Sequence, residues 1–435
     1  GSEMCIRDSF IQSMGKYKLI NNVLGWIVFA IASTVYLMTM EPTASFWDCG
    51  EFISSAYKLE VGHPPGAPFF MLTANLFTQL ASDPSTVAKM VNTMSALFSG
   101  LTILFLFWSI THLARKIMVK DGEEASLGQM ITVMGSGLVG ALAYTFSDTF
   151  WFSAVEGEVY AYSSLFTAVV FWLILKWEAV ADKPHADRWI VLIAYLMGLS
   201  IGVHLLNLLC IPAIVLVYYY KKFPNPTMKG TLVALLASFA IVALMMYGVV
   251  QGLVEVCGYF ELLFVNVLGM PYNSGVFAYV IIVAGVLIWS IWETMRDEIH
   301  PTRMKIAFIL SVVLIGIPFI GSGYVLAVIL TAALSLYLFK SKKVDIKTLN
   351  TILVCLMVVV VGYSSYALTL IRATADTPMN QNAPSDIFTL RTYLAREQYG
   401  KTPLLYGQTY VSEVQRENQG GSCVPVTTEG EPTWS

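Results

Sequence analysis

The feature that most constrains this chain is a succession of long apolar segments. A run of about 20 apolar residues can cross a bilayer as a helix, and only helices and closed barrels satisfy their backbone hydrogen bonds there. Segments of this kind are expected at 19–40, 86–113, 128–147, 160–177, 189–203, 205–220, 230–252, 276–292, 306–320, 323–339 and 349–371. We therefore predict an all-α integral membrane protein with about 11 transmembrane helices.

The composition supports this prediction. Hydrophobic residues make up 56% of the 435 residues and charged residues only 13%, whereas soluble domains carry about 25% charged residues. A formal net charge of −3 provides no basic surface, so we expect no nucleic-acid partner. The apolar stretches 189–220 and 306–339 are too long for one helix, and glycine-containing triplets interrupt them at 202–204 and 321–323. We therefore treat each stretch as two helices.

Basic residues are unevenly distributed between the loops. They collect after every second apolar segment: Arg115, Lys116, Lys120, Lys183, Arg188, Lys221, Lys222, Lys229, Arg296, Arg303, Lys305, Lys342, Lys343 and Lys347. Because lysine and arginine accumulate in cytoplasmic loops, we predict a cytoplasmic N-terminus and an external C-terminal tail. The alternation holds only if 68–81 does not cross the membrane, so 69–80 is predicted to be an interfacial or re-entrant helix.

The polar groups that this topology gathers on the outer face form the candidate site. Asp48 and Glu51, three residues apart, follow the first apolar segment, and His63 precedes a Pro-Pro-Gly turn. The later outer segments add Glu156, Glu158, His204 and Asn207. Polar groups beside hydrocarbon are costly, which indicates a function. The structural alternatives are solvated loop acids for the carboxylates and a turn cap for His63.

The residue types in this set can be compared with those that different reactions require. Transfer of a sugar to a hydroxyl group needs a carboxylate that takes the acceptor proton, and a phosphate leaving group benefits from hydrogen-bond donors or a cation. A divalent cation is possible, but no spacing is diagnostic of one, and the six cysteines show no metal or redox spacing. No phosphate-binding glycine loop, nucleophile elbow or zinc-helix motif is present in the sequence, so direct use of a nucleotide is not expected.

Two motifs carry a family resemblance. They are PTASFWDCGEFI at 42–53 and VGHPPGAP at 61–68, with supporting matches in AVEGEVY at 154–160, GLSIGVH at 198–204, GMPYNSG at 269–275 and REQYG at 396–400. With these motifs the chain resembles the transmembrane-protein-260-like protein O-mannosyltransferases, a family first catalogued as a domain of unknown function. The resemblance covers most of the chain from about residue 18 to 407.

The resemblance implies a C-type (GT-C) membrane glycosyltransferase fold and activity. Such an enzyme would move a sugar, here mannose, from a polyprenyl-phosphate carrier to an acceptor hydroxyl, expected on protein serine or threonine, with inversion of configuration. Asp48, with Glu51 beside it, would be catalytic. The expected substrate-binding residues are His63, Glu156, Glu158, Tyr160, His204 and Asn207. No metal ligand is assigned.

The resemblance and the charge pattern together give a domain organisation. Residues 1–13 are expected to be a non-native leader, 14–371 the GT-C-like membrane domain with outer-face loop helices, and 372–435 the start of a truncated extracytoplasmic region. The expected location is a bacterial inner membrane with a periplasmic active face, and the expected partners are the lipid-linked donor, an exported acceptor protein and membrane lipid. A multi-span transporter and an export or assembly factor remain open as alternatives.

Overall fold

The computed structural model describes residues 2–120, 122–320, 324–341, 344–400, 407, 411, 425–428 and 431–434. Its regular elements in this part of the chain are helices, apart from one antiparallel hairpin of β1 (Pro425–Thr428) and β2 (Glu431–Trp434), in which Pro425 pairs with Trp434. The chain divides into an N-terminal unit, Gly1–Leu59 with Ala67–Ser238, and a C-terminal unit, Glu60–Gly66 with Phe239–Ser435. Helices dominate both units, as predicted.

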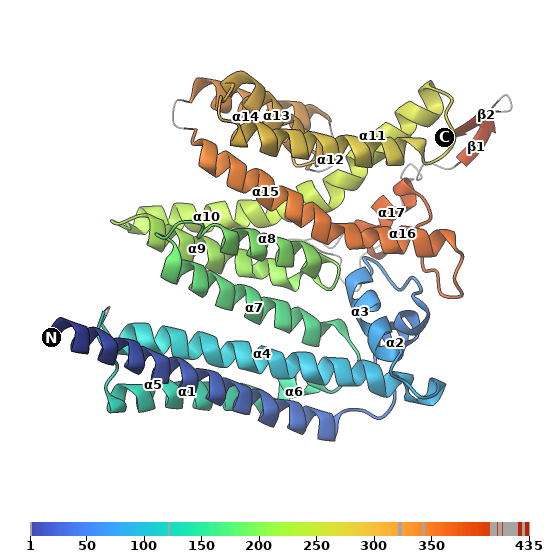
Figure 1. Ribbon diagram of the computed structural model, residues 1–435. Coiled ribbons are helices and arrows are strands. Elements are labelled where there is room, and N and C mark those ends of the chain that lie inside the picture. The colour runs from blue at the N-terminus through green and yellow to red at the C-terminus, as the bar shows by residue number, and fades with distance from the viewer. Residues whose placement is uncertain are drawn as a thin grey trace. The chain divides into compact units, whose positions relative to one another are not determined.

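The N-terminal unit contains the first membrane helices and the short helices between them (Figure 1). Its elements are α1 (Ser2–Thr39), α2 (Cys49–Lys58), α3 (Pro68–Thr78), η1 (Pro84–Thr86), α4 (Val87–Met118), α5 (Leu127–Thr145), α6 (Asp148–Ala154), α7 (Val159–Val180), α8 (Arg188–Ile201), η2 (Leu205–Cys210), α9 (Ile211–Lys222) and most of α10 (Met228–Ala243).

Helix α4 is the centre of this unit because α1, α5 and α7 all pack against it (Figure 1). The close approach of α1 depends on Gly100, where an added Cβ would lie only 2.0 Å from Ser33 Oγ. Small residues allow membrane helices to pack closely in this way. The buried core extends from Val28 and Tyr36 on α1 to Phe107 on α4. This packed helical frame therefore supports the loops that connect its helices.

The C-terminal unit consists of the segment Glu60–Gly66 and the later helices. These elements are η3 (Leu244–Gln251), α11 (Gly252–Leu262), η4 (Leu263–Val267), α12 (Ser274–Met295), α13 (Pro301–Leu314), α14 (Tyr324–Lys340), α15 (Ile346–Tyr363), η5 (Ser364–Tyr366), α16 (Ala367–Thr374), α17 (Ile387–Leu394), η6 (Glu397–Tyr399), β1 and β2. Helix α12 packs against α11, α13 and α15. The buried Glu261 carboxylate accepts hydrogen bonds from the backbone N–H groups of Asn273, Gly275 and Val276, and so satisfies the N-terminus of α12.

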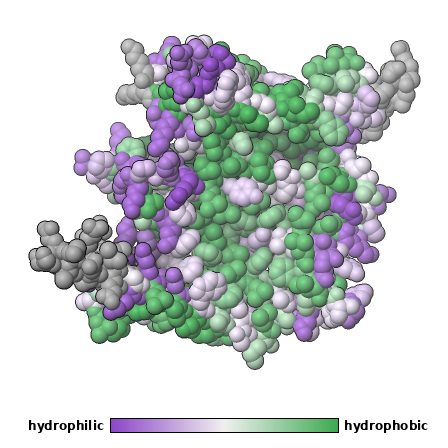
Figure 2. All heavy atoms as spheres, in the orientation of Figure 1, coloured by the Kyte–Doolittle hydropathy of each residue, from purple (hydrophilic) through white to green (hydrophobic). Residues whose placement is uncertain are grey.

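Eight helices in the described residues are long and apolar enough to cross a membrane. Their bounds are Gly15–Thr39, Pro84–Met118, Leu127–Thr145, Val159–Val180, Leu205–Lys222, Met228–Val267, Ser274–Met295 and Ile346–Thr374. Figure 2 shows apolar residues over much of the helical surface in view, with hydrophilic residues gathered toward helix ends. An apolar surface of this kind suits contact with lipid and confirms an integral membrane protein.

The other three predicted spans also fall on helices, but these are short for a membrane span. Helices α8 and α13 have 14 residues each and α14 has 17, whereas a straight span needs about 20. Helix α13 ends just before Gly316, whose positive φ of 94° is incompatible with a continuing helix. The predicted break at 321–323 lies outside the described residues.

The predicted interfacial segment 69–80 forms α3, whose 11 residues are too few to cross a bilayer. Pro68 begins this helix, in the position where a missing N–H costs least. The N–H groups of Phe69 and Phe70 donate to the carbonyl oxygen of Gly202, at 2.7 and 3.2 Å. The start of α3 is therefore hydrogen-bonded to the turn that follows α8, where His204 lies.

Candidate active site

Asp48 lies at the start of α2, as the residue that precedes its first helical position. Its carbonyl oxygen accepts the Phe52 N–H at 2.9 Å, but its side chain makes no capping hydrogen bond and is exposed to solvent. Glu51, in the first turn, is half-buried, and an acidic residue there is favoured by the helix dipole. The carboxylate of Asp48 is thus presented outward from a helix terminus.

The loop before Asp48 is attached to the core helix α4 by Asn92. The fully buried Asn92 amide donates from Nδ2 to the carbonyl oxygens of Glu41 and Thr43, at 2.7 and 3.0 Å. The Glu41 N–H in turn donates to the carbonyl oxygen of Val155 at 3.0 Å. These bonds hold the loop that precedes α2 beside the turn that precedes α7.

The turn between α6 and α7 carries two glutamates. Glu156 and Glu158 flank Gly157, and the Glu158 N–H donates to the Glu156 carbonyl oxygen at 3.0 Å. Glu156 is only 2% exposed, while Glu158 is half-buried. A Cβ at Gly157 would lie 2.9 Å from Asn92 Oδ1, so the turn packs directly on α4.

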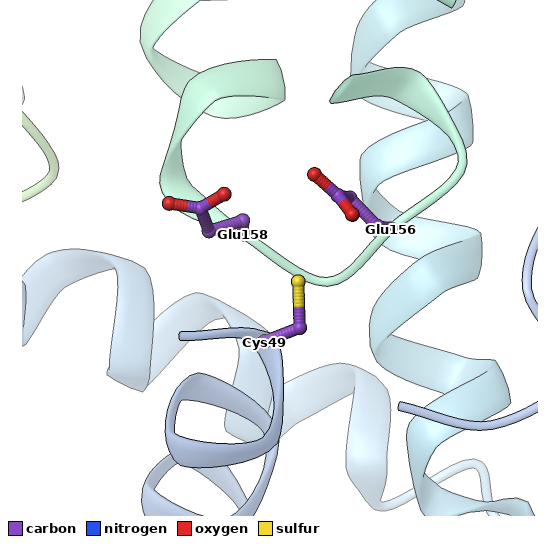
Figure 3. A group of neighbouring side chains, drawn as sticks. All are labelled: Cys49, Glu156 and Glu158. Carbon is purple, nitrogen blue, oxygen red and sulfur yellow. The ribbon is translucent and has the colours of Figure 1, made fainter. Parts of the chain in front are cut away.

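The Cys49 side chain extends from α2 toward both glutamates (Figure 3). Burial raises the pKa of the Cys49 thiol to about 12, and the negative charges of Glu156 and Glu158 act in the same direction. Burial also raises the pKa of the Glu156 carboxyl, although hydrogen bonds from Ser45 and Cys49 oppose this effect. The thiol therefore keeps its proton and donates a hydrogen bond to Glu156.

Tyr160 and His204 extend the site away from this cluster. Tyr160, in the first turn of α7, is 40% exposed and interacts electrostatically with Glu158 and Asp48. Its ring centroid lies 5.4 Å from that of His204. Nδ1 of His204 accepts the Leu206 N–H at 3.2 Å and so begins η2. Because Nδ1 is an acceptor here, a neutral imidazole carries its proton on Nε2.

The structure thus brings together five of the eight residues predicted from the sequence: Asp48, Glu156, Glu158, Tyr160 and His204. Glu51 lies in the first turn of α2, three residues after Asp48, and its predicted catalytic role stays a prediction. Asn207, near His204, is instead fully buried, and its Nδ2 donates to Ser200 Oγ at 2.9 Å. Thr167 donates to its Oδ1 at 3.4 Å. The amide of Asn207 is therefore engaged within the protein, where it stabilises the turn.

His63 belongs to the C-terminal unit. The Tyr393 hydroxyl donates to the carbonyl oxygens of Gly62 and His63, at 2.6 and 3.3 Å. Val61 forms a parallel bridge with Asn380. The backbone of this turn is thus fixed by the residues after α16, and the predicted role of the His63 side chain in substrate binding stays a prediction.

Cys49 is the site residue that sequence reasoning missed. One ligand atom from each of Cys49, Glu156 and Glu158 lies within 4.8 Å of the others, which makes them the group of three that could hold a metal ion among the described residues. The two segments are far apart in sequence, so no motif spacing announces the group. The cysteine's position directly after Asp48 was the one available signal.

Comparisons with known proteins show what the sequence is similar to. Residues 48–227 match the family model described as the "Protein O-mannosyl-transferase TMEM260 N-terminal domain". The mouse "Protein O-mannosyl-transferase TMEM260" is 28% identical over 174 residues, which are 40% of this chain and 22% of the mouse protein. The corresponding Dictyostelium discoideum protein is 25% identical over 187 residues, or 42% of this chain and 21% of that protein. No solved structure matches.

The matched region, residues 48–227, includes the candidate site. It contains all eight site residues predicted from the sequence and also Cys49. The chain spans only about a fifth of the length of these curated relatives. Over residues 48–227, the chain is therefore similar to the N-terminal domain of the protein O-mannosyl-transferase TMEM260 family.

Proposed function

We propose that this protein transfers a mannosyl group from a polyprenyl-phosphate carrier to a serine or threonine hydroxyl of an exported protein. The names of the matched relatives support mannosyl transfer to protein. The observation that carries the proposal is the Asp48 carboxylate, which is exposed at a helix terminus and not used as a cap. A group placed in this way can reach a hydroxyl that approaches from outside the membrane.

In the proposed reaction, Asp48 acts as the general base. The acceptor oxygen attacks the anomeric carbon and forms the new glycosidic bond while its proton moves to Asp48. The bond between the anomeric carbon and the phosphate oxygen breaks, and the carrier phosphate leaves with the electron pair. A single displacement of this kind inverts the configuration, and a well-placed base contributes about 100-fold to 10,000-fold in rate.

The departing phosphate is stabilised in this scheme by the Tyr160 hydroxyl and the Nε2–H group of His204. Donors directed at developing negative charge lower the barrier because they are already positioned when the bond breaks. The neighbouring turn η2 exposes Leu206 by 45% and Leu209 by 66%. These apolar side chains are suited to contact the lipid tail of the carrier and so place its phosphate beside His204.

The test uses membranes that contain the full chain or an Asp48→Asn variant, supplied with labelled polyprenyl-phosphate mannose and an exported acceptor protein. Asp48→Asn should lower transfer by about 100-fold or more, because the amide cannot accept the proton. The matched control is Asp148→Asn, which changes an exposed outer-loop acid at the start of α6 and should leave transfer unchanged.

Products are identified by mass spectrometry of the acceptor, and protein amounts are equalised by immunoblot. Label on serine or threonine that disappears in Asp48→Asn alone supports the proposal. Equal transfer by both variants rejects Asp48 as the base. If the folded unmodified protein transfers no sugar from several lipid-linked donors, the transferase proposal itself is rejected in favour of transport or assembly.

A further inference from the structure

The group formed by Cys49, Glu156 and Glu158 has no assigned part in the proposed transfer reaction. The cysteine comes from the first position of α2, and the glutamates come from the turn between α6 and α7 (Figure 3). One ligand atom from each residue lies within 4.8 Å of the other two. A sulfur and two carboxylate groups therefore converge from two separate segments.

A second observation is that two buried oxygen atoms beside this group accept no hydrogen bond. Glu156 is 2% exposed, and its Oε2 atom has no hydrogen-bond partner. Asn92 is fully buried, and its Oδ1 atom, which faces the Gly157 turn, also has none. Buried oxygen atoms left without a partner each cost roughly 1 to 3 kcal/mol. A bound cation would satisfy the Glu156 oxygen directly.

The ligand set indicates the class of cation. Carboxylates alone favour Mg²⁺ or Ca²⁺, whereas a thiolate favours softer ions such as Zn²⁺. Zinc lies about 2.0 to 2.3 Å from its oxygen and sulfur ligands, so two ligands of one ion are separated by roughly 3.5 Å. The ligand atoms, which are at most 4.8 Å apart, would therefore have to approach one another by roughly 1 Å when an ion binds.

We infer that Cys49, Glu156 and Glu158 bind a divalent transition-metal ion of the zinc class. The thiol proton of Cys49 is released to solvent when the ion binds, as metal binding to cysteine requires. Three protein ligands leave a fourth position open to water or to a phosphate oxygen. This inference rests on the geometry of the cluster and does not depend on the proposed transfer reaction.

The test measures metal binding directly on the full chain, purified in detergent and stripped with a chelator. Cobalt(II) serves as the probe because a thiolate ligand gives it a strong charge-transfer band in the near ultraviolet. The expected result is one equivalent of cobalt with this band, displaced by zinc. Cys49→Ser should abolish the band, while Cys210→Ser, which changes another buried cysteine of the N-terminal unit, should keep it.

The carboxylate ligands are tested by competition titration with zinc. Loss of even an outer partner of a metal ligand costs about 10-fold to 100-fold in affinity, so Glu156→Gln and Glu158→Gln should each weaken zinc binding by at least that factor. Glu158 is half-buried, which makes its variant the less disruptive of the two. Size-exclusion profiles establish that each variant is folded.

Three results would overturn the inference. They are a folded, stripped protein that binds no cobalt, bound cobalt without the charge-transfer band, and zinc affinity unchanged in both glutamine variants. The hydrogen bond from Cys49 to Glu156 would then account for the cluster. Because the readout is metal binding, failure here leaves the transfer assay unaffected, and failure of the transfer assay leaves this measurement unaffected.

Discussion

At the scale of single residues, the packing around Gly157 leaves no space for a side chain. A Cβ there would lie 2.9 Å from Asn92 Oδ1 and 3.0 Å from both Ile53 Cγ1 and Val91 Cγ1. These neighbours are buried, so they have little freedom to move aside. The absence of a side chain at Gly157 is what allows the turn with Glu156 and Glu158 to sit against α4.

We predict that Gly157→Ala destabilises the protein by about 1 to 3 kcal/mol, the usual cost of overpacking a tight core. The measurement is thermal or denaturant unfolding of the purified protein in detergent. Gly50→Ala is the matched control, since no atom lies within 4 Å of a Cβ added at that neighbouring site position. Equal stability of the two variants would show that the turn can move away from α4.

The candidate site was only partly predictable from single residues. Asp48, Glu156, Glu158, Tyr160 and His204 could be singled out because each lies near the end of an apolar segment. Their roles stay predictions. The contribution of Cys49 could not, because it depends on the packing of α2 against a turn that is remote in sequence. The membership of His63 in the other unit depends on Tyr393, which no local pattern connects with it.

At the scale of elements, polar caps determine where several helices begin. The Asp345 carboxylate caps α15 through the backbone N–H of Thr348 at 3.0 Å and its hydroxyl at 2.9 Å. Hydrogen bonds from the Thr348 side chain and backbone hold the pKa of Asp345 below its ordinary value. A lowered pKa in the folded state means that the ionised carboxylate stabilises the fold.

Asp345→Ala should therefore destabilise the protein at pH 7 by about 0.5 to 1 kcal/mol, in the lower part of the range for N-caps because the residue is exposed. The stabilisation is fully present above the ordinary carboxyl pKa of about 3.9 and disappears as the pH falls through the lower folded-state value. Unfolding measured at pH 7 and again near pH 3 checks this. A difference between variant and parent that grew toward acid pH would contradict it.

Element boundaries were less predictable than element positions. Every predicted apolar segment lies on a helix, because hydrophobic length is a direct physical requirement of the bilayer. The ends of α8 and α13 depend on a 3₁₀ turn begun by His204 and on the positive φ of Gly316. Such local backbone features have no counterpart in hydropathy, so these two helices end two and six residues before the predicted positions.

At the scale of the whole molecule, the alternation of basic loops makes a prediction about orientation. If lysine and arginine mark the cytoplasmic face, then Ser82, between α3 and α4, faces outward, and Glu123, between α4 and α5, faces the cytoplasm. Both residues are exposed, so both can report on their side of the membrane.

The measurement places single cysteines by Ser82→Cys and Glu123→Cys in a background without other cysteines, and treats intact cells with a membrane-impermeant maleimide. The cysteine at 82 should react in intact cells, and the one at 123 only after the membrane is permeabilised. If only the cysteine at 123 reacted in intact cells, the orientation would be the opposite of the predicted one, and the candidate site would lie on the cytoplasmic side.

The seven-residue segment Glu60–Gly66 belongs to the C-terminal unit although the chain before and after it belongs to the N-terminal unit. No single cut can therefore separate the two units into intact halves, and the region that matches the family model, 48–227, includes residues of both units. An exchange of C-terminal halves between relatives would have to carry these seven residues with it. A substitution near Tyr393 or Asn380 must therefore remain compatible with the segment around Val61 and Gly62, which lies more than 300 residues earlier in the sequence.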